Sequence, residues 1–150
     1  MASGTYTTQT DLPVEAILST ILDFPSYPDF LETVQTVQVR LQGPPVWEVY
    51  FEIEVVRRLS YSLRLELKNS YELHWFLLDG FFLSNSGYWK LTPNAKGTLV
   101  EYKVQTQIET FLPRMIKKML SEQLLPKTVD SFTSETRARL ALKKIDPTDN

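Results

Sequence analysis

The sequence predicts an α+β fold in which a curved, seven-stranded antiparallel sheet wraps around one long C-terminal helix. Hydrophobic residues recur every three or four positions in two N-terminal stretches and one long C-terminal stretch, and they alternate with polar residues in between. Of the 150 residues, 43% are hydrophobic, which is enough for one buried core. Because no linker or internal repeat divides the chain, we expect one domain over residues 1–145 and a polar tail over residues 146–150.

The N-terminal part is predicted to form one strand and two short helices. Residues 4–10 are polar and rich in threonine, and we expect them to form a strand. Residues 12–22 place their hydrophobic side chains on one helical face, with Asp11 as the expected N-cap. Two prolines in the next segment must break or restart the helix, so we expect a second short helix around residues 26–32.

The middle of the chain is predicted to form six further strands, because large apolar side chains alternate there with polar ones. We expect turns at Gly43-Pro44-Pro45, Arg57-Arg58, Asp79-Gly80 and residues 93–97. A long sheet of twisted strands must curl, which leaves room for a cavity between its concave face and the terminal helix. The six strands are expected over residues 37–41, 47–55, 59–68, 71–77, 81–92 and 98–109.

The C-terminal segment, residues 113–145, is predicted to be helical. Pro113 opens it and no glycine interrupts it. Its apolar positions keep one helical phase on both sides of Pro126, which favours one kinked helix, although a proline is equally compatible with the end of a first helix. The stripe that faces the sheet is Met115, Ile116, Met119, Leu120, Leu125, Val129, Phe132, Thr136 and Leu140.

Composition excludes several classes of function. The chain has no cysteine and a single histidine, so thiolate metal sites, disulfides and two-histidine mechanisms are excluded. No apolar run is long enough to span a membrane, and no nucleophile or phosphate-binding motif is present. The charged residues of the strands fall on the faces opposite the apolar ones. We therefore expect no catalytic residue, no metal and no cofactor, in a soluble cytoplasmic protein without a transmembrane segment.

The candidate ligand-binding residues are mostly large aromatic side chains on the inward faces of the strands. Simple core packing is the alternative explanation for each of them. Two methionines of the helix add adaptable walls, and Asn85 either orients a polar group of a ligand or marks a bulge. The predicted ligand-binding residues are Trp47, Phe51, Tyr61, Tyr71, Trp75, Asn85, Trp89, Tyr102, Met115 and Met119.

The charge is distributed unevenly along the chain. Residues 1–112 hold 8 basic and 13 acidic side chains, whereas residues 113–145 hold 8 basic and 3 acidic ones. The basic helix is either a solvated face or a contact surface for an anionic membrane or for nucleic acid. Because the whole chain has a net charge of −2, nucleic acid or the ribosome is the less favoured partner.

Several motifs together resemble those of START-type helix-grip proteins of the SRPBCC superfamily, in the branch of polyketide cyclases/dehydrases and coenzyme-Q-binding proteins. The most specific is the segment D-F-P-S-Y-P-D-F-L at residues 23–31. The resemblance implies a deep cavity for lipids, quinones or polyketides, and it transfers no catalytic residue to this sequence. The other motifs are Leu12-Pro13-Val14-Glu15, residues 87–91, residues 97–102 and Leu112-Pro113.

Three hypotheses of function follow. The first is a non-catalytic carrier or chaperone for a hydrophobic small molecule, bound between the sheet and the C-terminal helix. The second is a cyclase or dehydratase acting on a polyketide-like substrate, in which Asn85 or Tyr61 assists. The third, implied by ribosome-associated members of the same branch, is an interaction module that uses the basic helix against RNA or a protein surface.

Overall fold

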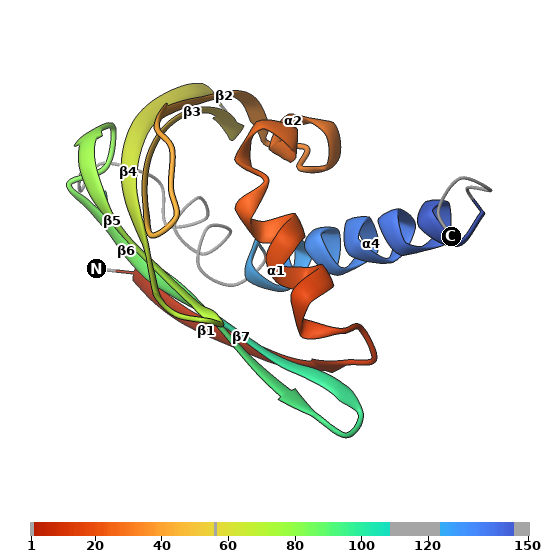
Figure 1. Cartoon of the computed structure of the whole chain (residues 1–150). Helices are drawn as coiled ribbons and strands as arrows, with labels where there is room; N and C mark the ends of the chain where they lie inside the picture. The colour runs from red at the N-terminus through yellow and green to blue at the C-terminus, as the bar shows by residue number, and fades with distance from the viewer. Residues whose placement is uncertain (1, 56, 109–123, 146–150) are drawn as a thin grey trace.

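The described part of the chain forms one sheet of seven antiparallel strands in the order β1-β7-β6-β5-β4-β3-β2. The computed structural model describes residues 2–55, 57–108 and 124–145 (Figure 1). The predicted number of strands and their antiparallel pairing are confirmed. Arg57 and Arg58, which the sequence places at a turn, are the first two residues of β4. The strands are β1 (Ala2–Thr10), β2 (Val34–Leu41), β3 (Val46–Val55), β4 (Arg57–Asn69), β5 (Glu72–Gly80), β6 (Ser84–Asn94) and β7 (Gly97–Gln107).

Helices lie across the open side of the curved sheet (Figure 1). The helix α1 (Val14–Leu22), the 3-10 helix η1 (Phe24–Ser26) and the helix α2 (Tyr27–Phe30) connect the two edge strands, β1 and β2. The helix α4 (Leu124–Ile145) packs against α1 and α2. The predicted combination of a curved antiparallel sheet, two short helices after the first strand and a C-terminal helix is therefore confirmed.

The predicted C-terminal helix is described from Leu124 onward. Its residues 113–123 lie outside the described part of the chain, as does the tail predicted over residues 146–150. Pro126 lies within the first turn of the described helix. The hydrophobic stripe is confirmed over these turns, since Leu125, Val129 and Phe132 are buried.

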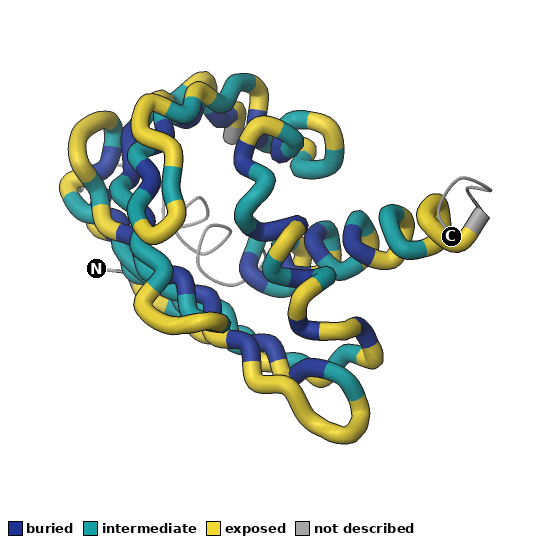
Figure 2. The backbone as a smooth tube through the Cα atoms, viewed as in Figure 1, coloured by how far each residue is buried: buried dark blue, intermediate teal, exposed yellow. Residues whose placement is uncertain are grey.

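The alternation of apolar and polar residues explains the orientation of the strands. In β3, Trp47, Val49, Phe51 and Ile53 are buried, whereas the three residues between them are only half-buried. The same alternation of buried and more exposed residues runs along neighbouring strands (Figure 2). Because successive side chains of a strand point to opposite faces, one face of the sheet carries the core and the other faces solvent.

The start of α1 differs from the prediction. Asp11 is not the N-cap; α1 begins at Val14, and the preceding Pro13 takes the extended backbone conformation of an N-cap residue. The carboxylate of Asp11 instead lies 2.8 Å from the guanidinium of Arg137 in α4 (Oδ1 to Nη2). Asp11 therefore connects the N-terminal elements to the C-terminal helix.

The predicted turn at Asp79-Gly80 is wrong. β5 continues through both residues, with Gly80 opposite Tyr61 of β4, and residues 81–83 connect β5 to β6. β6 pairs with β5 only as far as Ser86, so the C-terminal end of β5 pairs with β4 alone. Gly80 has a φ of +122°, and a Cβ there would lie 2.4 Å from the Tyr61 Cα. The glycine is thus required for a close approach of two strands rather than for a turn.

Two buried hydroxyl groups connect α4 to α1. The Oγ1 atoms of Thr136 and Thr20 lie 2.8 Å apart, and each also lies within 3.1 Å of a backbone carbonyl oxygen one turn earlier in its own helix. Both residues are fully buried. Because a buried hydroxyl needs a hydrogen-bond partner, this contact favours one position of α4 along α1.

Candidate functional site

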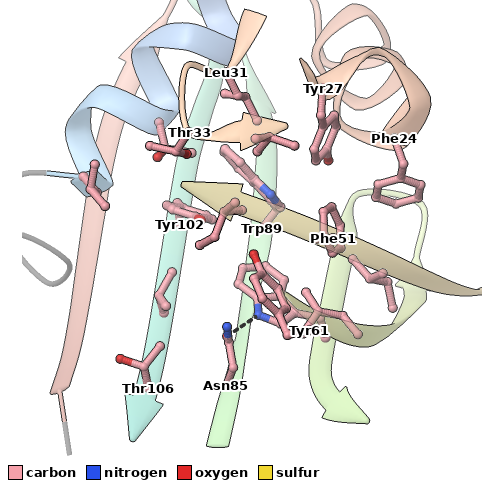
Figure 3. A pocket seen from close by; sticks show the side chains of 18 of the residues that line it. Phe24, Tyr27, Leu31, Thr33, Phe51, Tyr61, Asn85, Trp89, Tyr102 and Thr106 are labelled. Carbon is pink, nitrogen blue, oxygen red and sulfur yellow. Dashed lines mark hydrogen bonds between the residues drawn. The ribbon is translucent and has the colours of Figure 1, made fainter. Parts of the chain in front are cut away.

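A cavity lies between the concave face of the sheet and the N-terminal end of the described α4. Its volume is about 200 Å³. Figure 3 shows side chains from the short helices, from the sheet and from α4 around it. The cavity occupies the place that the sequence predicts for a ligand site.

Six of the ten predicted ligand-binding residues line this cavity. They come from five consecutive strands of the sheet, β3 to β7, and share the concave face because each occupies an inward position of the alternating pattern. The six residues are Phe51, Tyr61, Trp75, Asn85, Trp89 and Tyr102.

Two of the predicted residues lie elsewhere, and two lie outside the described residues. Trp47 is buried, but its ring packs edge-on against Phe24 with 5.7 Å between the ring centroids, beyond the cavity lining. Tyr71 is half-buried, and its hydroxyl donates a hydrogen bond of 3.1 Å to Glu15 of α1. Met115 and Met119 fall in the segment 109–123, which the structure does not describe.

Other lining residues come from helices and from strand positions that sequence reasoning did not assign to the ligand. Phe24, Tyr27 and Leu31 extend over the cavity from the segment around η1 and α2. Tyr27 and Leu31 lie within the second short helix that the sequence predicts around residues 26–32. Four residues of α4 also contribute, namely Leu124, Leu125, Thr128 and Phe132.

Aromatic rings pack against one another around the cavity. Phe51 stacks on Tyr61 with 5.4 Å between centroids, and Trp89 lies 4.3 Å from Tyr102. Phe132 of α4 meets Trp89 edge-on at 5.0 Å. These contacts hold the rings in defined orientations, so the cavity has rigid aromatic walls.

Among the described lining residues, none is an aspartate, glutamate, histidine, lysine or arginine. The ionisable groups are tyrosines, and burial raises the pKa of Tyr61 and of Tyr102 well above the usual range. Both hydroxyls therefore remain protonated at neutral pH. General acid-base catalysis needs a group that exchanges protons near the working pH, and the described lining offers none.

His74, the single histidine of the chain, does not line the cavity. It is half-buried on β5, with Nε2 3.3 Å from Glu72, and its ring lies against Tyr88. Within residues 2–55, 57–108 and 124–145, no group of three or more histidine, cysteine, aspartate or glutamate side chains could hold a metal ion.

The basic residues of α4 contact acidic residues of the N-terminal elements. Lys127 Nζ lies 2.8 Å from Glu32, and Arg139 lies 3.0 Å from Asp23. With Arg137, three of the five basic side chains of α4 form such pairs. Arg137 and Lys127 lower the pKa values of Asp11 and Glu32, respectively. Three basic residues of the described part of the helix thus serve contacts within the protein, and a membrane or nucleic-acid contact stays a prediction.

Comparison with known proteins identifies the family to which the sequence is similar. A family model described as "Polyketide cyclase / dehydrase and lipid transport" matches residues 10–133. Comparison with curated protein sequences finds no match. In the described part of the chain, no helix is both long enough and apolar enough to cross a membrane.

Solved structures of similar fold have low sequence identity to this chain. A START superfamily protein from Mycobacterium smegmatis has a TM-score of 0.81 at 14% identity, over 92% of this chain and 99% of that one. The Zhui aromatase/cyclase from Streptomyces sp. R1128 has a TM-score of 0.77 at 15% identity, over 92% of this chain and 94% of that one. A STAR-related lipid transfer protein fragment from Xanthomonas axonopodis has a TM-score of 0.72 at 11% identity, over 89% of this chain and 84% of that one. These likenesses show the START-type helix-grip fold.

Proposed function

Because the chain belongs to the polyketide cyclase/dehydrase and lipid transport family, we propose that it binds a hydrophobic small molecule between the sheet and α4. In this proposal the protein acts as a carrier or chaperone, and the ligand is a lipid, a quinone such as coenzyme Q, or a polyketide-like molecule. The observation that carries the proposal is a cavity of about 200 Å³ whose described lining has aromatic and aliphatic walls and no charged side chain.

Affinity in such a cavity would come mainly from removing apolar surface from water. Each 100 Å² of apolar surface that is buried contributes about 2.5 kcal/mol before the costs of association. The aromatic pairs Phe51–Tyr61 and Trp89–Tyr102 provide flat faces for a ring or a conjugated chain. A planar or extended apolar ligand therefore suits these walls.

Filling the cavity with a larger side chain should block the ligand. Val104 of β7 lines the cavity, and we expect Val104→Phe to weaken the binding of the neutral fluorescent probe N-phenylnaphthylamine by about ten-fold or more, which corresponds to about 1.4 kcal/mol. The matched control is Lys103→Phe, which adds a ring at the neighbouring position on the opposite face and should leave the affinity within about two-fold.

The measurement is a fluorescence titration, combined with solvent extraction and mass spectrometry of gently purified protein. Equal probe affinities of Val104→Phe and the wild type would show that the probe binds elsewhere. A wild type that yields no extracted lipid, quinone or polyketide and takes up no probe would contradict the proposed function.

A cyclase or dehydratase is the second candidate function. The observation that favours it is that polar side chains, Tyr61 and Asn85 among them, line the cavity. The fold of the aromatase/cyclase from Streptomyces sp. R1128 is similar. Incubation with a linear poly-β-ketone distinguishes the two roles: an enzyme releases a cyclised product, whereas a carrier returns the molecule unchanged from its complex.

A further inference from the structure

Asn85 of β6 is a buried polar residue in the wall of the cavity. Only 8% of it is exposed, and its side chain lies beside that of Thr106 (Figure 3). The strand register places the two residues directly opposite each other on β6 and β7. Asn85 and Thr106 thus form a polar patch in a lining that is otherwise largely aromatic and aliphatic.

The indole of Trp75 determines which way the Asn85 amide points. Trp75 Nε1 donates a hydrogen bond of 3.1 Å to Oδ1 of Asn85. An indole N–H only donates, so its partner must be the amide oxygen and not the amide nitrogen. The Nδ2 group of Asn85, with its two N–H donors, is therefore the part of the amide that remains available.

A glycine makes room for this arrangement. Gly87 is the residue of β6 opposite Trp75, and a Cβ at Gly87 would lie 2.6 Å from Cζ2 of the indole. The Trp75 ring lies over this glycine and reaches Asn85, two residues away on the same face of β6. The combination of Trp75, Asn85 and Gly87 orients the amide without any charged group.

The available donors of Asn85 have no partner in the part of the chain that the structure describes, because Nδ2 donates to no protein atom there. The Tyr61 hydroxyl, which also lines the cavity, likewise donates to none of the described residues. Neither atom is closed off from the cavity, so both donors are accessible to a molecule that enters it. A ligand that brings an acceptor oxygen to this patch gains a hydrogen bond, which typically contributes about 0.5–1.5 kcal/mol net.

We propose that Asn85 is the specificity-determining residue of the cavity and donates a hydrogen bond through Nδ2 to a carbonyl oxygen of the ligand. The inference rests on the proposed function and narrows its ligand class. The preferred ligands are apolar molecules that carry a ketone, ester or quinone carbonyl, and pure hydrocarbons or alkyl chains are disfavoured.

The test compares two probes of nearly equal size, acetylnaphthalene and ethylnaphthalene, which differ in a carbonyl group against a methylene group. Their affinities are measured by displacement of N-phenylnaphthylamine. Asn85→Asp at pH 8 keeps an oxygen acceptor for Trp75 but replaces the donating amide nitrogen with an oxygen. We expect this variant to lower the ketone-to-hydrocarbon affinity ratio about ten-fold.

A second variant and a control make the result specific. Asn85→Leu has no polar atom and should lower the same ratio in the same direction, so it decides the question if the aspartate variant fails to fold. Ser86→Ala removes a hydroxyl from the next residue of β6, on the face opposite the cavity, and should change the ratio by less than about two-fold. Urea unfolding of each variant confirms that it is folded.

The outcomes separate the two proposals. Binding of both probes with an unchanged ratio in the Asn85 variants would overturn the assignment of Asn85 and leave the hydrophobic carrier standing. A lowered ratio in those variants, with the affinity for ethylnaphthalene retained, is the supporting result. If the wild type binds neither probe, the proposed function fails, and the role of Asn85 fails with it.

Discussion

Replacing Phe132 by alanine is expected to lower the free energy of unfolding by about 3–5 kcal/mol. Phe132 is 2% exposed, and its ring meets those of Tyr27, Phe30 and Trp89 edge-on at 5.0 to 5.1 Å. It therefore joins α4 to α2 and to β6. Removing the ring enlarges the existing cavity at the point where α4, α2 and β6 meet, and the neighbouring rings lose their packing contacts.

The control for this variant is Phe76→Ala, which removes the same ring from an exposed position. Phe76 is 47% exposed on β5, and its loss should change the free energy of unfolding by no more than about 0.5 kcal/mol. Urea unfolding followed by circular dichroism measures both variants. A loss below about 1 kcal/mol for Phe132→Ala would show that this ring does not hold α4 against the sheet.

Replacing Gly87 by alanine is expected to destabilise the protein by about 1–3 kcal/mol and to disturb the ligand site at the same time. The added Cβ would lie 2.0 Å from the backbone oxygen of Lys103 and 2.6 Å from the Trp75 ring. A backbone oxygen within a paired strand has little freedom to move, so β6 and the indole must shift instead. The hydrogen bond from Trp75 to Asn85 should then be lost.

Ser86→Ala is the matched control for this prediction, because it changes the neighbouring residue of the same strand on the opposite face. We expect its effect on the free energy of unfolding to stay within about 0.5 kcal/mol. Urea unfolding reports the stability, and near-ultraviolet circular dichroism reports the environment of the tryptophans. An unchanged tryptophan spectrum in Gly87→Ala would contradict the close packing of Trp75 over Gly87.

The sequence predicts the sheet and its inward face well, because alternation is a local property. Phe51, Tyr61 and Trp89 line the cavity as predicted, each from an inward position of a different strand. Alternation does not indicate how far along a strand the cavity extends. Trp47 shares the face of Phe51, but it lies where Phe24 covers the sheet, and so it packs in the core instead.

Residues supplied by helices were harder to predict. Phe132 belongs to the apolar stripe that the sequence predicts for the C-terminal helix, but its role and that of Phe24 depend on how α4 and η1 dock onto the sheet. That docking is set by long-range contacts such as Thr20 with Thr136. The Asp79-Gly80 turn was wrong for a related reason, since β4 is long enough to pair with β5 beyond the end of β6.

The pairing of the first strand with the last has a consequence for the order of assembly. β1 pairs with β7 in a register that sets Ala2 opposite Thr106, more than 100 residues later in the chain. On the ribosome, β1 must therefore wait for nearly all of the sheet to be made before it finds its neighbour. The walls that α4 adds arrive later still, so the cavity closes only after the residues up to Phe132 have been synthesised.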